Sequence, residues 1–510
     1  MIISYKNKMK LQDIWNYVYE GSPVMLDKTG TLEAKIERNH QFFLATVASG
    51  QDVYGVTTGF GQSSKNRFDK SLSQKLQVNL YNYHGCGVGP SLSEQECAAV
   101  TAIRLNCFSQ GVSGVSYDLL RQIELLLDKR IFPVIPSQGS VGASGDLTPL
   151  SYLAAVMAGE RMCYANGKVE PAGETLARVG IKPYAFKARE ALAIMNGTSV
   201  MCGIASLALR EVMKCADLAC DLTALLVELL GSRTAPFASE THSVKPHPGQ
   251  VKAAARIWSG INQPYLKLNS APSYHRAIQD PYSIRCAPHV IGVLYDAIDS
   301  ATAAIENEVN SASDNPVFLD DAELVLNSGH FFGGHIAHVC DNLKTALANT
   351  INLMDRQIAH IMDLKDHSYL PENLVATKSL GEEAILHHGF KAMQITLSAL
   401  SSEILKNSMP ISIFSRPTES SNQDVVSLGT IAARELAHLV NLSRDSMAVT
   451  AMFLRQGFFV AEENGYRPEL GDRAKGLLGA VGESFPAMIA DRPLDHDITQ
   501  VGRALFATRT

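Results

Sequence analysis

Residues 336–361, IAHVCDNLKTALANTINLMDRQIAHI, decide the fold class, because they carry one long apolar stripe. The stripe consists of residues three, four or seven positions apart: Ile336, Leu343, Leu347, Met354, Ile358 and Ile361. Such spacing places side chains on one face of an α-helix. At 1.5 Å per residue, a helix of this length extends for about 40 Å. The segment therefore predicts a long helix with an apolar face to bury.

Similar stripes occur in two other parts of the chain, residues 291–305 and 425–460. Together the stripes contain many Ala residues and several Ser residues, which permit close packing. Long helices alternating with irregular segments are typical of a helix bundle. The sequence before residue 200 differs, with short candidate strands and frequent Gly and Pro. We expect a mainly α fold with a long central helix bundle. Its parts are a loop-rich N-terminal domain (1–200), the bundle (201–480) and a C-terminal helical segment (481–510).

Composition excludes several classes of protein. Apolar residues make up 46% of the 510 residues and charged residues 19%, which excludes a disordered chain or a disulfide miniprotein. The formal charge of −6 argues against a general polyanion binder, so no nucleic-acid partner is expected. Nine cysteines without a C-x-x-C pair indicate a reducing compartment. No signal-like start and no apolar run of 18 residues is present, so we expect a cytoplasmic protein without a membrane partner.

Residues 139–150, GSVGASGDLTPL, form the most unusual segment. It lacks the lysine of a phosphate loop, the spacing of a dinucleotide fingerprint and the G-x-S-x-G order of a nucleophile elbow. One interpretation is a turn that begins a helix, with Asp146 near the N-cap and Pro149 in the first turn.

The alternative interpretation is chemistry of the backbone itself at Ala143, Ser144 and Gly145. A glycine nitrogen can approach the carbonyl carbon two residues earlier, because no Cβ blocks it. A tight turn makes that attack intramolecular. Closure and loss of two waters would give a ring with an exposed methylidene carbon, an electrophile that no encoded side chain supplies. A helix N-terminus beside the ring could stabilise negative charge on its oxygen.

This segment resembles the active-site loop of the aromatic amino acid and histidine ammonia-lyases, which make a methylidene-imidazolone (MIO) group from their own chain. Further motifs in the same order support the resemblance over most of the sequence: 54–61 (YGVTTGFG), 196–199 (NGTS), 282–285 (YSIR), 313–316 (SDNP) and 422–427 (NQDVVS). The resemblance implies an MIO group formed from Ala143, Ser144 and Gly145, with no external cofactor. It also implies a homotetramer whose sites combine residues from different subunits.

The resemblance assigns catalytic roles to two tyrosines. Tyr54, in a glycine-flanked loop, would be the base that removes the β-proton, and Tyr282 would help to handle protons or orient the substrate. Arg285 would pair with the substrate carboxylate, preferably as a bidentate fork. Without the motifs, Tyr54 would be a core aromatic residue and Arg285 a member of an ordinary ion pair.

Polar residues would surround the reacting groups. The resemblance implies that Asn196 contacts the ring or the amine and that Gln423 forms a hydrogen bond near the ring. Glu419 resembles the acidic residue that meets the substrate amine in phenylalanine-type relatives, although it could equally be a solvated glutamate. His330 stands where relatives carry an asparagine that holds the substrate carboxylate. It could donate to that carboxylate or mark a changed substrate.

The segment around Tyr83 and His84 resembles the wall at the side-chain end of the pocket. Phenylalanine-specific relatives have apolar pairs there, and histidine- and tyrosine-using relatives have a histidine. The Gln423-Asp424 pair and the segment 196–199 resemble the phenylalanine and tyrosine group. We therefore expect L-tyrosine as substrate and 4-coumarate as product. The alternatives are a histidine ammonia-lyase, an aromatic aminomutase and a catalytically silent scaffold.

A metal centre is not expected. His335, His338 and Cys340 lie close in the sequence, but their spacing suits successive turns of a helix, and no second ligand cluster accompanies them.

Overall fold

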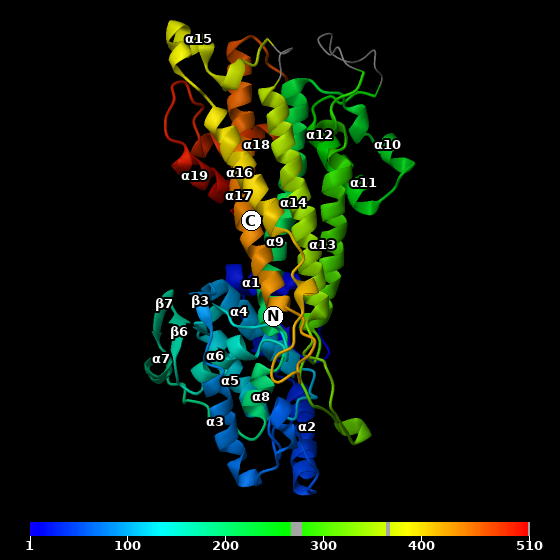
Figure 1. Cartoon of the computed structure of the whole chain (residues 1–510), viewed down its shortest axis with the longest axis vertical. Helices are drawn as coiled ribbons and strands as arrows, with labels where there is room; N and C mark the ends of the chain where they lie inside the picture. The colour runs from blue at the N-terminus through cyan, green and yellow to red at the C-terminus, as the bar shows by residue number, and fades with distance from the viewer. Residues whose placement is uncertain (267–277, 364–367, 508–510) are drawn as a thin grey trace. The chain divides into compact units, whose positions relative to one another are not determined.

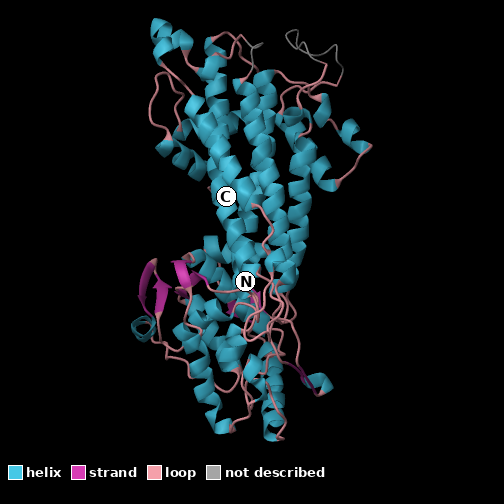
Figure 2. Ribbon diagram, in the orientation of Figure 1, coloured by secondary structure: helices cyan, strands magenta, loops and turns pink. Residues whose placement is uncertain are grey.

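The structure, a computed structural model, describes residues 1–266, 278–363 and 368–507 (Figure 1). It is mainly helical, as the sequence predicts (Figure 2). The longer helices are α1 (Leu11–Glu20), α2 (Thr31–Ala48), α3 (Ser73–Tyr83), α4 (Glu94–Phe108), α5 (Tyr117–Asp128), α6 (Leu147–Met157), α9 (Ser199–Leu230), α11 (Pro248–Gly260), α13 (Ala287–Val309), α14 (Gly334–Met362), α16 (Lys391–Asn407), α17 (Gly429–Glu463), α18 (Asp472–Ser484) and α19 (Asp495–Phe506). The short ones are α7 (Ala172–Arg178), α8 (Glu190–Met195), α10 (Ser239–Ser243), α12 (Tyr282–Arg285) and α15 (Thr377–Leu380).

The strands are short and pair locally. A three-stranded antiparallel sheet joins β4 (Ile131–Pro133), β6 (Met162–Ala165) and β7 (Lys168–Pro171). The other sheets are two-stranded and pair β1 (Ile2–Ile3) with β2 (Met25–Leu26), β3 (Val88–Ser91) with β5 (Pro136–Gln138), and β8 (Val317–Leu319) with β9 (Leu324–Leu326).

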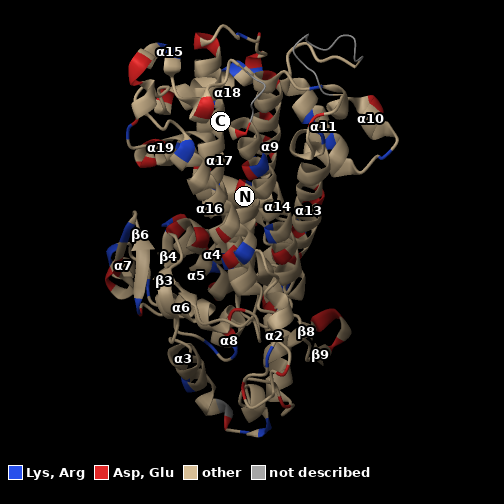
Figure 3. Cartoon of the chain, turned by 45° about the horizontal axis from the view of Figure 1, so that its top comes forward, with Lys and Arg blue, Asp and Glu red and all other residues tan. Residues whose placement is uncertain are grey.

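The three apolar stripes are helices. The stripe in 336–361 lies on α14, and all six of its apolar residues are nearly inaccessible to solvent. The stripe in 291–305 lies on α13, and most of 425–460 lies on α17. Acidic and basic residues are interspersed along these helices and elsewhere (Figure 3). Within the described ranges, no helix has both the length and the apolar character required to cross a membrane.

The chain divides into two compact units. The first consists of 1–208, 301–341 and 410–437, and the second of 209–300, 342–409 and 438–510. The predicted segments 1–200, 201–480 and 481–510 follow chain order and stay a prediction. The compact units are interleaved instead, because α9, α13, α14 and α17 each contribute residues to both.

The core of the first unit is built on α4, which is buried from Cys97 to Phe108 and contacts α1, α5 and β4. Beside this core, α3, α6 and α8 pack against one another. This packing brings together the end of α3, the loop that precedes α6 and the residues that follow α8. Three candidate segments far apart in the sequence therefore meet.

The second unit is a bundle held by apolar packing and a few buried polar contacts. Gln357 on α14 donates to the Thr223 hydroxyl on α9 over 3.1 Å. Ser398 on α16 donates to Asp355 on α14 over 2.7 Å. Phe390 and Phe453 form an edge-on aromatic pair with ring centres 4.9 Å apart.

Candidate active site

The loop before α6 makes a tight turn at Ala143, Ser144 and Gly145. Ala143 and Gly145 are bridge partners of each other, and Gly145 also bridges to Gly197. Gly145 has φ +69°, and a Cβ there would collide with the carbonyl of Gly197. Only glycine fits both the left-handed backbone and the close approach. The bridge holds Ala143 and Gly145, the two ends of the tripeptide, close together, as ring closure requires, and these residues fit an MIO group.

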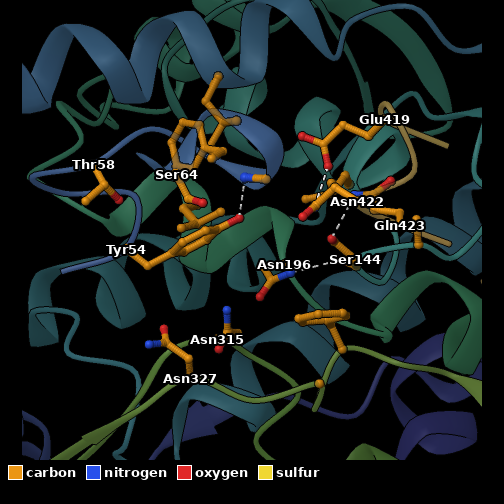
Figure 4. A pocket seen from close by; sticks show the side chains of 18 of the residues that line it. Tyr54, Thr58, Ser64, Ser144, Asn196, Asn315, Asn327, Glu419, Asn422 and Gln423 are labelled. Atoms are coloured by element: carbon orange, nitrogen blue, oxygen red, sulfur yellow. Dashed lines mark hydrogen bonds between the residues drawn. The ribbon is translucent and has the colours of Figure 1, made fainter. Parts of the chain in front are cut away.

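Two amide side chains donate to Ser144 (Figure 4). Asn196 Nδ2 lies 2.9 Å from the Ser144 carbonyl oxygen, and Gln423 Nε2 lies 3.2 Å from Ser144 Oγ. The Thr418 hydroxyl donates to Gln423 Oε1 over 2.8 Å, which fixes the orientation of that amide. The other amide oxygen, Asn196 Oδ1, is buried and has no hydrogen-bond partner within the described chain. Both predicted amides therefore converge on the predicted serine.

Asp146 is the N-cap residue of α6, as the helix-start interpretation predicts, but its side chain does not cap α6. It binds the first turn of α9 instead. The carboxylate accepts from the backbone N–H groups of Val200 (3.0 Å) and Met201 (2.9 Å) in the first turn of α9, and also from the Thr430 hydroxyl. Burial raises the pKa of Asp146 to about 6, against the effect of these donors. Asp146 therefore fastens the serine loop to α9, a role that local spacing does not reveal.

A cavity of about 1140 Å³ opens in front of Ser144. Eight of the predicted site residues line it: Tyr54, Tyr83, His84, Ala143, Ser144, Asn196, Glu419 and Gln423. The fold thus brings most of the predicted site residues to one cavity, although they come from segments more than 350 positions apart in the sequence.

Tyr54 lies on the cavity wall with its hydroxyl engaged. Its oxygen accepts from the Gly61 N–H over 2.7 Å, and its ring meets Phe60 edge-on with ring centres 6.3 Å apart. Burial raises the pKa of Tyr54; the Gly61 N–H opposes the shift and the Glu419 carboxylate adds to it. In this state the phenol is protonated near neutral pH.

Glu419 lies in a strained turn between Thr418 and Gln423. Glu419, Ser420 and Ser421 all have positive φ angles, of 50°, 53° and 63°. Glu419 Oε1 accepts from the Gln62 N–H over 3.0 Å, which links this turn to the Tyr54 loop. Strained backbone of this kind is frequent at functional sites.

His84 follows α3, and its imidazole contacts the Tyr83 ring at a tilt of 34°, with ring centres 4.3 Å apart. Its Nδ1 lies 3.3 Å from the hydroxyl of Thr148 on α6. Burial lowers the pKa of His84 to about 4, so the ring is neutral near pH 7. The cavity therefore carries a neutral imidazole on one wall.

Tyr282, Arg285 and His330 are not among the residues that line this cavity. Tyr282 and Arg285 form α12 in the second unit, where the guanidinium lies 4.4 Å from the centre of the Tyr282 ring. Tyr282 lines a separate cavity of about 560 Å³, and Arg285 Nε is buried without a hydrogen-bond partner in the described chain. His330 is exposed, although its neighbours Gly329 and Phe331 line the larger cavity.

Several lining residues were not predicted individually. The motifs contain Phe60, Asn315, Asn422 and Asp424, so their neighbourhood was a signal, but no catalytic or binding role was assigned to them individually. Others had no local signal because their side chains reach the cavity only through tertiary packing: Leu80, Leu147, Leu192, Asn327 and Phe332. Across the described ranges, no group of three or more His, Cys, Asp or Glu side chains could hold a metal ion.

Comparison with known proteins relates this arrangement to one family. Residues 9–481 match the family model described as aromatic amino acid lyase. The chain is 34% identical to a histidine ammonia-lyase of Gloeobacter violaceus, covering 94% of this chain and 91% of the relative. It is 35% identical to a tyrosine ammonia-lyase of Cereibacter sphaeroides, covering 91% and 90%. A crystal structure of the tyrosine aminomutase of Streptomyces globisporus superimposes with a TM-score of 0.91 at 31% identity, covering 99% and 97%.

Proposed function

As a member of the aromatic amino acid lyase family, the chain is a carbon–nitrogen lyase, and we propose that it converts L-tyrosine to 4-coumarate and ammonia. One observation carries the choice of substrate: the neutral imidazole of His84 lines the same cavity as Ser144 and Tyr54. That cavity offers a polar partner to a hydroxylated aromatic ring at a distance from the reacting groups.

Ala143, Ser144 and Gly145 would supply the MIO group. When formed, this group is an electrophile that captures the substrate amine and makes it a better leaving group. Asn196 would hold its oxygen, because Asn196 Nδ2 donates to the Ser144 carbonyl oxygen. Gln423 Nε2 donates to Ser144 Oγ, the oxygen that leaves as water, so this amide would lie beside the formed group. A donor aimed at an oxygen where negative charge develops stabilises that charge.

Tyr54 would remove the β-proton. The proton passes to the phenolate oxygen, its electron pair forms the new C=C bond, and the amine leaves with the C–N pair. The Gly61 N–H already donates to this oxygen and would stabilise the phenolate. The substrate ammonium, entering near Tyr54 and Glu419, would lower the raised pKa of the phenol, because a nearby positive charge favours the ionised form.

His84 would recognise the far end of the substrate. A neutral imidazole can donate to or accept from the 4-hydroxyl of tyrosine. Phenylalanine would leave this nitrogen without a partner at a cost of about 1–3 kcal/mol. Tyr83, whose ring contacts the His84 imidazole, would complete this wall.

The carboxylate end of the substrate would be bound by Arg285 and His330, and Tyr282 would help to handle protons or orient the substrate. Since Arg285 and Tyr282 do not line the cavity of their own chain, we propose that another copy in a homotetramer supplies them. The Nε of Arg285 is buried and has no hydrogen-bond partner among the described residues, which supports a role beyond a simple surface charge.

Incubation of the purified protein with tyrosine, phenylalanine and histidine separately tests the proposal. We expect 4-coumarate as the main product, identified by chromatography and mass. Urocanate as the sole product would establish a histidine ammonia-lyase instead, and a β-amino acid an aminomutase. An unmodified peptide 139–150 with no product would indicate a silent scaffold.

A further inference from the structure

The imidazole of His84 is fixed from behind by the first turn of α6. Its Nδ1 lies 3.3 Å from Thr148 Oγ1, whereas its Nε2 has no hydrogen bond to any residue that the structure describes. Because the side chain lines the cavity, Nε2 is the nitrogen left for a ligand.

The backbone of His84 is tied to the same turn. The Ser151 hydroxyl lies within hydrogen-bond distance of the carbonyl oxygens of His84 (3.2 Å) and Thr148 (2.7 Å). Arg161 donates to Ser151 Oγ over 3.1 Å and to the Tyr81 carbonyl over 2.6 Å. The end of α3 is therefore held to α6, and rotation of the imidazole is the freedom that remains.

The Thr148 hydroxyl restricts that rotation. Thr148 is 8% exposed and β-branched, so its side chain has few rotamers. A hydroxyl can donate or accept, so it satisfies Nδ1 in either neutral tautomer. Without the Thr148 hydroxyl, the partly buried Nδ1 of His84 would have no hydrogen-bond partner, and the imidazole would rotate toward a different partner.

The same short segment carries the reacting serine. Thr148 follows Ser144 by four residues, and α6 begins between them. The first turn of α6 therefore sets the distance between the reacting centre and the imidazole. A change at Thr148 would alter which ring is accepted without touching the residues that react.

We propose that Thr148 is a positioning residue for substrate choice: its hydroxyl holds the His84 imidazole so that Nε2 meets the 4-hydroxyl of a hydroxylated aromatic ring. The inference rests on the proposed function and names a determinant of its specificity.

Thr148→Val removes the hydroxyl at constant shape, and Thr148→Ser keeps it. Two readouts apply: the ratio of kcat/KM for tyrosine over phenylalanine, and the ratio of the dissociation constants of cinnamate and 4-coumarate, which needs no turnover. We expect Thr148→Val to lower both ratios about tenfold, the effect of one lost hydrogen bond. Values for phenylalanine and cinnamate should stay within about twofold, and Thr148→Ser should keep most of the preference.

Thr101→Val is the matched control. The Thr101 hydroxyl is buried and bonds to the Cys97 carbonyl over 2.8 Å inside α4, so this variant loses a similar hydroxyl outside the cavity lining. It should leave both ratios unchanged. The mass of the peptide 139–150 shows whether each variant matures, and Thr148→Ala provides a second variant without the hydroxyl if valine disturbs folding.

The inference is overturned if folded Thr148→Val or Thr148→Ala keeps both wild-type ratios. It is also overturned if Thr148→Ser lowers the ratios as much as Thr148→Val does. If Thr148→Val weakens turnover and binding equally for the hydroxylated and the unsubstituted ring, Thr148 has a general structural role, and the inference is again overturned. If the wild-type protein forms no 4-coumarate, the proposed function fails, while the binding ratio still tests Thr148. A wild type that binds both acids equally overturns the inference in that case.

Discussion

Gly145→Ala should prevent maturation of the serine loop, because two independent constraints meet at this position. Gly145 has φ +69°, a conformation that L-residues rarely adopt, and an added Cβ would strike the carbonyl of Gly197. That carbonyl also accepts the Asp146 N–H over 2.8 Å. Relief of the clash would therefore pull apart the contact that closes the turn.

The two costs can be added. Left-handed backbone costs a non-glycine residue about 1–2 kcal/mol. Disruption of the hydrogen bond between Asp146 and Gly197 costs about 1 kcal/mol. A total of about 2–3 kcal/mol, concentrated on one turn, lowers the population of the closed turn about 30- to 150-fold. Ring closure, which depends on that population, should slow in proportion.

Peptide mass spectrometry of residues 139–150 measures the effect directly. We expect the wild-type peptide to be lighter by two waters and the Gly145→Ala peptide to keep its full mass. Gly167→Ala is the matched control, since Gly167 has φ +74° and no atom within 4 Å of an added Cβ. It carries the backbone strain alone and should mature normally. A Gly145→Ala peptide that loses two waters as completely as the wild type would refute the reasoning.

Three further outcomes are expected. Ser144→Ala should abolish turnover and leave the peptide at full mass, with the melting temperature nearly unchanged; substantial remaining activity would argue against the proposed electrophile. Tyr54→Phe should lower kcat about 100-fold or more while the dissociation constant of 4-coumarate stays within about threefold, and a pure rise in KM would contradict its role as the base. Burial lowers the pKa of His84 from 6.5 to about 4, so the stability from its neutral form is complete above pH 6.5 and is lost as the pH falls toward 4. Melting temperatures of wild type and His84→Gln between pH 4 and 8 should therefore converge on the acid side, and a constant gap would exclude this titration.

The sequence predicted helices where apolar residues recur at helical spacing, and candidate site residues where a motif is present. The apolar stripes of 291–305 and 336–361 became α13 and α14, because helical spacing is a property of the chain itself. Ser144, Asn196 and Gln423 belong to motifs, so the sequence alone could name them as candidates. In the structure all three line one cavity.

Packing partners could not be predicted in the same way. The spacing of Asp146 indicates the start of α6, and only the fold shows that its carboxylate holds the first turn of α9. The contact between Thr148 and His84 joins residues 64 positions apart, and neither residue carries a signal for the other. The compact units could not be predicted from the sequence either, because a single helix such as α17 contributes residues to both.

Arg285 does not line the cavity of its own chain, so the proposed homotetramer would link substrate binding to assembly. The cavity is lined by two cationic residues, Lys65 and Arg67, and Arg67 is already paired with Asp52 through contacts of 2.6–3.0 Å. A substrate carboxylate near Ser144 would thus lack the bidentate partner that such a group requires for firm orientation. If another copy supplies Arg285, a dissociated protomer should keep a mature serine loop, because residues 139–150 are held within their own unit. It should nevertheless bind 4-coumarate poorly. Separate measurement of maturation and binding across a dilution series tests this consequence, and tight binding by isolated protomers would show that Arg285 of another chain is not needed.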